Sequence, residues 1–149
     1  RFNFGFGLAA IVAIIHDVTL MLGFFSFTGL EFNLTSIAAL LTIIGYSIND
    51  SVVIFDRIRE NMRKLKKSPL TKIVNLSVNE TLSRTIITAG TTIIALLALV
   101  FLGGEVLRSI SLAELFGVID GTYSSIYIAS PVLIYLREKK HAKQAKDIS

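Results

Sequence analysis

Carboxylic acids interrupt the long apolar stretches of this chain at four places. The four residues are Asp17, Asp50, Glu114 and Asp120. A charged side chain at the centre of a bilayer costs about 2.5–3.5 kcal/mol on insertion scales, so such residues normally face the interior of a helix bundle. Because residues of this kind mark ion and proton paths, this is the chemistry that we expect here.

Asp50 is the strongest candidate because it lies in the motif GYSINDSVVIFDRIREN, residues 45–61, directly after Asn49. Residues three, four and seven apart share one face of a helix. On the second apolar stretch, one such face carries Thr42, Tyr46, Asn49, Asp50 and Val53. On the third stretch, a polar face carries Arg84, Thr88, Thr91, Thr92 and Ala95. We expect these faces to meet, which brings Asp50 near Arg84.

A carboxyl group opposite a guanidinium can exchange a proton near neutral pH. Burial favours the neutral acid, whereas a nearby Arg favours the carboxylate, so the two effects oppose each other. Protonation of Asp50 then frees Arg84 and changes the helix pairing. The alternative is a buried Asp–Arg pair that only fixes the packing, and Arg84 can also extend to lipid headgroups from the edge of its stretch.

Asp17 and Asp120 are expected in the outer half of the bundle at comparable depth. There they can share protons or line an outward water path; the alternative is that each only hydrogen-bonds to a Ser or Thr of a neighbouring helix. His16 is expected to point about 100° away from Asp17, at the helical spacing of ~3.6 residues per turn, and to serve in packing or capping. Glu114 is expected near the outer interface.

Small residues recur four apart in the last apolar stretch. They are Gly117, Gly121, Ser125 and Ala129. Such a stripe lets helix backbones approach closely, so we interpret it as a packing surface. Pro131 follows near the inner end, where it can kink the helix.

The composition predicts an all-α, polytopic membrane protein. Of the 149 residues, 52% are hydrophobic, and the mean hydropathy is +0.66. A membrane helix needs about 20 largely apolar residues, and backbone hydrogen bonding in lipid then requires a helix. Four spans are expected, forming a four-helix transmembrane bundle, at about 4–27, 34–55, 76–102 and 110–136.

Basic residues give the expected orientation. Of the 15 Lys and Arg residues, 12 lie in the loop 57–75 and the tail 137–149. Positive residues favour the cytoplasmic side, so both ends of this chain are expected there. No aromatic residues are interleaved with these charges, and we expect no nucleic-acid partner. The chain begins without Met, and we expect it to be a piece of a longer polypeptide.

Neither metal chemistry nor catalysis is indicated. The chain has no Cys, and its two His residues, His16 and His141, are far apart in sequence. The motifs GxSxG and HExxH are absent, as is a GxGD motif. We therefore expect no enzyme, no metal and no cofactor; the transported ion is expected to be the proton, with sodium an open alternative.

The motif at residues 45–61 resembles the signature of SecF in the SecD/SecF family of protein-export membrane proteins, within the RND superfamily. Other segments agree with this resemblance, which covers about residues 1–140. They are HDV at 16–18, LSRTIITAGTT at 82–92, FLGG at 101–104 and GTYSSIYIASP at 121–131. The family has six spans with a large extracytoplasmic domain after the first, so this chain corresponds to the last four.

The resemblance implies a role in the late stage of protein export across a prokaryotic cytoplasmic membrane, driven by the proton-motive force. The implied partners are SecD, the SecYEG translocon, YajC, the translocating polypeptide and the lipid bilayer. The family's proton path implies roles for Asp50, Asn49 and Arg84, and Asp17 matches the family's HD motif. Asp120 departs from the family pattern, so its role rests on the sequence alone.

Two other functions stay open. One is a passive scaffold that stabilises SecD or SecYEG without moving ions. The other is an RND-like exporter of small molecules or lipids, which needs large extracytoplasmic domains and a binding pocket. An Asp50→Asn variant separates the scaffold from the proton-coupled subunit.

Overall fold

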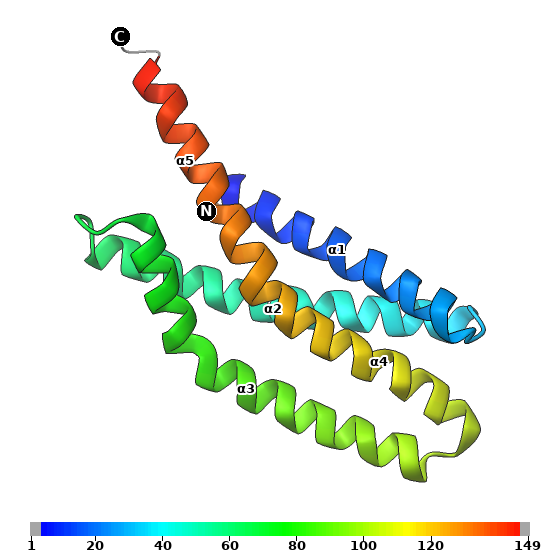
Figure 1. Cartoon of the computed structure of the whole chain (residues 1–149). Coiled ribbons are helices and arrows are strands. Elements are labelled where there is room, and N and C mark those ends of the chain that lie inside the picture. The colour runs from blue at the N-terminus through cyan, green and yellow to red at the C-terminus, as the bar shows by residue number, and fades with distance from the viewer. Residues whose placement is uncertain (1–3, 147–149) are drawn as a thin grey trace.

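The computed structural model describes residues 4–146, and nearly all of them are helical (Figure 1). In chain order the elements are α1 (Phe4–Thr28), α2 (Leu34–Lys64), α3 (Leu70–Leu102), α4 (Gly104–Ser124), the π-helix η1 (Ser125–Ala129) and α5 (Ser130–Lys146). No strand occurs within this described range. The all-helical class expected from the composition is thus confirmed.

The helices run up and down as an antiparallel bundle. Short connections join α1 to α2 and α3 to α4 at one end, and α2 to α3 at the other, while α5 extends beyond the bundle (Figure 1). Helices α2 and α4 each contact the other long helices of the bundle, so the pair forms its centre. The helices α1, α2 and α3 are each long and apolar enough to cross a membrane.

The expected span at 110–136 is a helix interrupted in its middle. It covers most of α4, all of η1 and the start of α5. Pro131 lies two residues after the end of η1, and a proline both lacks an N–H and clashes with the preceding helical turn. A single π-turn is a known way to absorb such a break without ending the helix.

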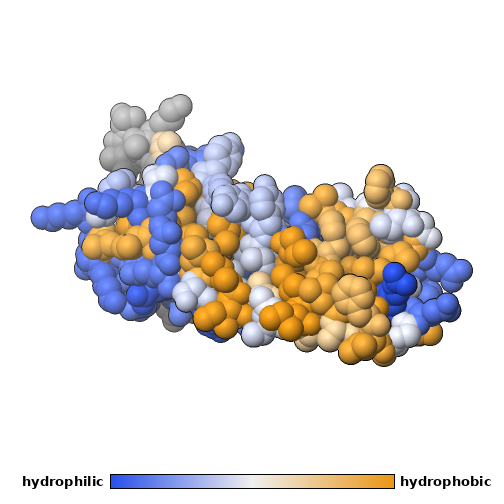
Figure 2. Space-filling model, turned by 60° about the horizontal axis from the view of Figure 1, so that its bottom comes forward, coloured by the Kyte–Doolittle hydropathy of each residue, from blue (hydrophilic) through white to orange (hydrophobic). Residues whose placement is uncertain are grey.

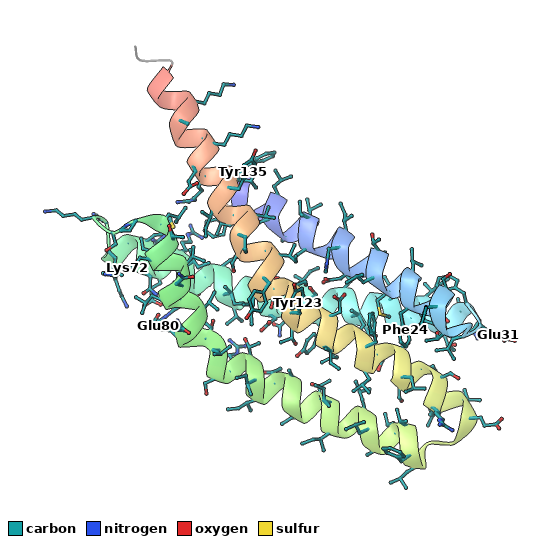
Figure 3. All side chains as sticks on the ribbon, viewed as in Figure 1. Phe24, Glu31, Lys72, Glu80, Tyr123 and Tyr135 are labelled. Carbon is teal, nitrogen blue, oxygen red and sulfur yellow. The ribbon has the colours of Figure 1, made fainter. Side chains whose placement is uncertain are left out.

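The basic loop expected at 57–75 is mostly helical. Helix α2 continues to Lys64 and α3 already begins at Leu70, so only five residues connect them. A hydrogen-bond network explains this extension: Arg57 Nε donates to Glu80 Oε2 over 2.6 Å, and Asn61 Nδ2 donates to the same oxygen over 2.7 Å. These bonds fix the basic ends of α2 and α3 side by side, and Figure 3 shows Glu80 on α3 at this end.

Two apolar clusters fill the interior, one towards each end of the bundle. The cluster at the basic end contains Phe6, Ala9, Ala13, Ile54, Phe55, Ile58, Val74, Ala129 and Leu133. The cluster at the opposite end contains Met21, Phe25, Ile43, Ala89, Leu96, Ala113 and Val118. On each helix the buried side chains between the two clusters are polar. We call this the polar layer: Asp17, Ser47, Asp50, Ser51, Thr85, Asp120, Ser124 and Ser125.

The outer surface is largely apolar. Large hydrophobic side chains such as Ile15, Leu41, Ile87 and Ile94 are exposed. Figure 2 shows hydrophobic residues gathered over much of one face, with hydrophilic residues towards its ends. A surface of this kind fits contact with lipid or with other membrane helices.

Small residues bring α4 against α2. A Cβ added at Gly117 would lie 2.4 Å from Cγ1 of Ile43, and one added at Gly121 would lie 3.4 Å from Cβ of Ser47. Ser125 and Ala129, four and eight residues further on, are both fully buried. The whole stripe therefore lies in the interior of the bundle.

We predict that Gly117→Ala lowers the thermal stability of the protein in detergent by about 1–3 kcal/mol, because the new methyl group overlaps Ile43. Gly90→Ala is the matched control, since a Cβ at Gly90 meets nothing within 4 Å. In an Ile43→Ala background, where the clashing atoms are gone, the same Gly117→Ala change is expected to cost less. Equal stability of the Gly117 and Gly90 variants would contradict this packing.

Candidate functional site

Asp50 links three helical elements through two hydrogen bonds. Its Oδ1 accepts from Thr85 Oγ1 of α3 over 2.9 Å, and its Oδ2 accepts from Ser125 Oγ of η1 over 2.5 Å. The carboxyl group is half-buried, whereas both hydroxyl donors are buried. A change in the protonation of Asp50 must therefore alter contacts that α2 makes with both α3 and η1.

Ser125 has two acceptors for its one hydroxyl proton. Besides Asp50, its Oγ lies 2.9 Å from the backbone oxygen of Thr122. A serine hydroxyl can donate only once but can accept as well. Ser125 can therefore donate to a charged Asp50, or accept from a protonated Asp50 while donating to Thr122.

Arg84, which was expected near Asp50, forms no direct ion pair with it among the described residues. Arg84 is exposed in this chain. Instead it lines a cavity of about 230 Å³ together with Val53 and Asp56 of α2. Arg84 is nevertheless next in sequence to Thr85, which does bond to Asp50.

The buried face of α3 also differs from the expected one. Thr81, Thr85 and Ala89 are buried, whereas Thr91 is exposed. The hydroxyl of Thr91 donates to a backbone carbonyl of its own helix, that of Ile87, over 2.9 Å. Because that bond satisfies the hydroxyl, Thr91 needs no partner on α2, and the polar stripe did not have to face the interior. Asn49 is likewise exposed.

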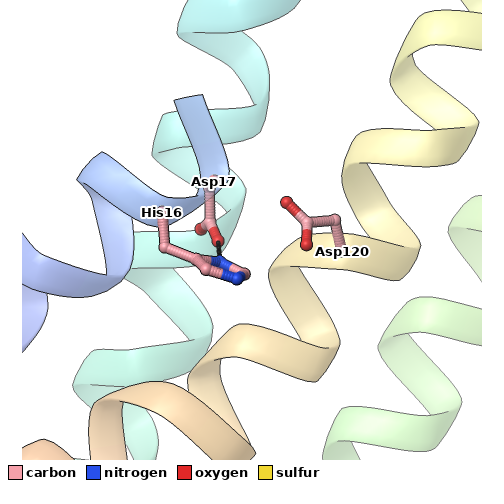
Figure 4. A group of neighbouring side chains, drawn as sticks. All are labelled: His16, Asp17 and Asp120. Carbon is pink, nitrogen blue, oxygen red and sulfur yellow. Dashed lines mark hydrogen bonds and ion pairs between the residues drawn. The ribbon is translucent and has the colours of Figure 1, made fainter. Parts of the chain in front are cut away.

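A second carboxyl cluster lies in the same polar layer. Asp17 is fully buried; its Oδ2 accepts from Ser47 Oγ over 2.5 Å, and its Oδ1 lies 3.3 Å from His16 Nδ1. Asp120 points from α4 towards this pair, and one ligand atom of each of His16, Asp17 and Asp120 lies within 4.8 Å of the other two (Figure 4). His16 thus lies against Asp17, although the sequence indicated that it would point away.

Asp120 differs from Asp17 in its hydrogen bonding. Its side chain is only 7% exposed, and its Oδ2 has no hydrogen-bond partner among the described residues. The alternative that each acid bonds to a Ser or Thr therefore describes Asp17, through Ser47, but not the buried oxygen of Asp120. Glu114, the fourth acid, is half-buried on α4.

The hydroxyl partners were missed by sequence reasoning. Ser47, Thr85 and Ser125 donate to the two aspartates, yet none was singled out from the sequence for this role. One signal was present: Ser47 is three residues before Asp50, which places both near one face of α2. Ser125 could not be assigned in this way, because its position depends on the π-turn.

At the basic end, Arg137 stacks on an aromatic ring and donates a hydrogen bond to a methionine sulfur. Its guanidinium carbon lies 5.2 Å from the ring centroid of Phe6, and its Nη1 lies 3.3 Å from Met62 Sδ. Burial lowers the pKa of this guanidinium below its ordinary value. These contacts attach α5 to α1 and α2 on the side away from the carboxyl clusters.

A bundle of apolar helices with carboxyl groups buried at mid-length defines a polytopic membrane protein of the kind that holds ionisable groups in its interior. The sequence pattern of the family described as "Protein export membrane protein SecD/SecF, C-terminal" matches residues 1–139. The chain therefore belongs to the SecD/SecF family.

Individual relatives agree with this assignment. The protein translocase subunit SecF of Rickettsia bellii is 60% identical over 143 residues, which cover 96% of this chain and 47% of that protein. SecF of Rickettsia prowazekii is 56% identical over 144 residues, covering 97% of this chain and 46% of that protein. The chain thus spans about half the length of the curated relatives it matches.

Solved structures show the same arrangement of helices. A crystal structure of SecDF in a super-membrane-facing form matches with a TM-score of 0.94 at 50% identity, covering 99% of this chain and 20% of that chain. A crystal structure of SecDF, a translocon-associated membrane protein from Thermus thermophilus, matches with a TM-score of 0.87 at 52% identity. The match covers 93% of this chain and 19% of that chain.

We predict that Thr85→Val destabilises the protein by about 1–3 kcal/mol, because Asp50 loses a donor in a half-buried place. Thr91→Val is the matched control: its hydroxyl is exposed and bonds only within α3. Thermal unfolding of the two variants in the same detergent measures the difference. A Thr91 variant as unstable as the Thr85 variant would show that the bond to Asp50 is not the cause.

Proposed function

We propose that this chain is the membrane-embedded part of a SecF-type subunit that couples ion flow to the late stage of protein export, with Asp50 as the group that takes up and releases a proton. The family assignment supports the export role. The observation that carries the coupling role is the hydrogen bonding of Asp50 to neutral hydroxyl groups on two other helical elements.

The geometry around Asp50 suggests how a proton alters the bundle. A charged Asp50 accepts from both Thr85 and Ser125. A protonated Asp50 must donate through one oxygen, and Ser125 can receive that bond by turning its own hydroxyl to Thr122. Since Ser125 is the first residue of η1, the exchange of bonds acts on the irregular turn between α4 and α5. A π-turn at a functional site is a recurring arrangement.

We propose that Arg84 acts on Asp50 through the cavity that Arg84 lines. The guanidinium carries the positive charge nearest in sequence to Thr85, and the cavity that it lines is formed partly by Val53, three residues after Asp50. Water in a polar cavity can carry hydrogen bonds between groups that do not touch. Proton coupling through Asp50 and Arg84 thus needs no direct ion pair.

The surroundings proposed for this chain follow from its surface and its family. The exposed apolar side chains suit a lipid bilayer and further membrane helices. We propose SecD, the SecYEG translocon and YajC as partners, the emerging polypeptide as the substrate, and the prokaryotic cytoplasmic membrane as the location, with the basic ends on the cytoplasmic side.

We predict that Asp50→Asn, in the complete protein, abolishes the part of export that depends on the ion gradient. An amide can occupy the same place, accepting from Thr85 and donating to Ser125, but it cannot exchange a proton. Export of a model precursor into membrane vesicles, with and without a proton gradient, measures the effect. Glu105→Gln, at an exposed position beyond α3, is the control and should leave export unchanged.

The same experiment discriminates among the functions. Gradient-driven export that persists in the Asp50→Asn protein favours a passive scaffold. Loss of gradient-driven export in a variant that still assembles with SecD supports the coupling role. A response to a sodium gradient in place of a proton gradient identifies sodium as the ion.

For Arg84 we predict that Arg84→Gln lowers gradient-driven export and that Arg84→Lys retains more of it, because lysine keeps the positive charge. Arg59 lines the same cavity, so Arg59→Gln is the matched control. If the Arg59 and Arg84 variants lose export equally, charge in the cavity as a whole matters and Arg84 has no separate role.

A further inference from the structure

The Asp120 carboxyl group is buried in surroundings that do not stabilise a negative charge. It is 7% exposed, its buried Oδ2 has no hydrogen-bond partner within residues 4–146, and it points at Asp17 from the neighbouring helix (Figure 4). A buried carboxylate that lacks hydrogen bonds is strongly disfavoured relative to the neutral acid. A second carboxylate close by disfavours it further, as in pairs of acids that share one proton.

No lysine or arginine compensates these two acids. The sequence contains none between residues 4 and 56, between 85 and 107, or between 109 and 136. The helical stretches that surround Asp120 therefore offer His16 as the one side chain able to carry a positive charge. On the facing part of α2 the ionisable residues are Tyr46 and Asp50. Along α4 and η1 they are Glu114, Tyr123 and Tyr127. Helix α3 has no ionisable residue after Thr85.

The two acids differ in their hydrogen bonds. Asp17 has both oxygens engaged: Oδ2 accepts from Ser47 Oγ, and Oδ1 lies 3.3 Å from His16 Nδ1. Asp120 has no such donors for its buried oxygen. We propose that His16, Asp17 and Asp120 form a second proton-binding site, separate from Asp50, in which Asp120 holds the proton.

A metal ion fits this site less well than a proton. A metal needs three or more free ligand atoms at close range. Here Asp17 Oδ2 already binds Ser47, and Asp17 Oδ1 lies against His16 Nδ1. One ligand atom of each of the three residues lies within 4.8 Å of the others, so a metal ion is the alternative occupant that the experiment below must test.

The second site lies next to the first along α2. Ser47, which bonds to Asp17, is three residues before Asp50, and Asp120 is five residues before Ser125, which bonds to Asp50. Both sites therefore use the same two elements, α2 and the α4–η1 helix. The proton site at Asp120 does not depend on the export mechanism proposed above, because it follows from burial and charge alone.

Infrared spectroscopy of the complete protein in lipid bilayers tests this proposal. The protein carries Asp50→Asn, so that Asp50 gives no signal, and its aspartates are labelled with ¹³C at the carboxyl carbon. We expect a carbonyl band from a protonated aspartic acid near neutral pH, and we expect Asp120→Asn to remove it. The Asp120 variant should fold, since its buried Oδ2 gives up no hydrogen bond, and Asp56→Asn, at an exposed position on α2, should leave the band intact.

Three outcomes overturn the proposal. The first is the absence of any protonated aspartate band in the Asp50→Asn protein. This outcome is observed without making the Asp120 variant. The second is a band that survives Asp120→Asn. The third is binding of Zn²⁺ or Mn²⁺ that Asp120→Asn abolishes, which indicates a metal site. Failure here leaves the role of Asp50 untouched, because Asp50 is absent from the measurement.

Discussion

The hydrogen bonds between the Asp50 carboxyl group and the hydroxyls of Thr85 and Ser125 are the contact on which the rest of the interior depends. They join α2 to α3 and to η1 in a place where a carboxyl group is expensive to bury. The donors are neutral hydroxyls, so within the described residues Asp50 is held by hydrogen bonds and not by a direct ion pair. An acid held in this way can change its protonation state without leaving a charged partner behind, whereas a broken buried ion pair leaves an uncompensated charge.

The packing of the bundle makes this contact available. Apolar clusters close the interior on both sides of the polar layer, and they keep α1, α2 and α4 in register. Gly117 and Gly121 allow α4 to approach α2 closely, which places Ser125 within reach of Asp50. The π-turn that begins at Ser125 then carries the helix to Pro131 without ending it. This packing lets several acids be buried at one depth. It depends on small residues, on serine hydroxyls and on the irregular turn.

Much of the fold could be predicted from the sequence, because a long apolar stretch in lipid has few alternatives to a helix. The position of α1 followed from apolarity, whereas the single layer that Asp17, Asp50 and Asp120 share did not, because Asp17 and Asp120 were expected in the outer half. The helical extension of α2 and α3 into the basic loop did not, since it depends on bonds from Arg57 and Asn61 to Glu80. The contact of His16 with Asp17 was missed because helical angles describe Cβ directions and not the reach of an imidazole. The relation of Asp50 to Arg84 was inferred from polar stripes. A threonine hydroxyl that donates to a carbonyl of its own helix needs no other partner, so a stripe of threonines does not indicate which helix face is buried.

The most direct test of the central claim is to follow the Asp50 carboxyl carbon by solid-state ¹³C NMR in lipid bilayers across the pH range in which export operates. The account predicts that this resonance moves between the positions of a carboxylate and a carboxylic acid, and that the environment of Ser125 changes over the same pH interval. A carboxyl resonance that stays at one position throughout that range would contradict the account, because Asp50 would then be a fixed element of packing.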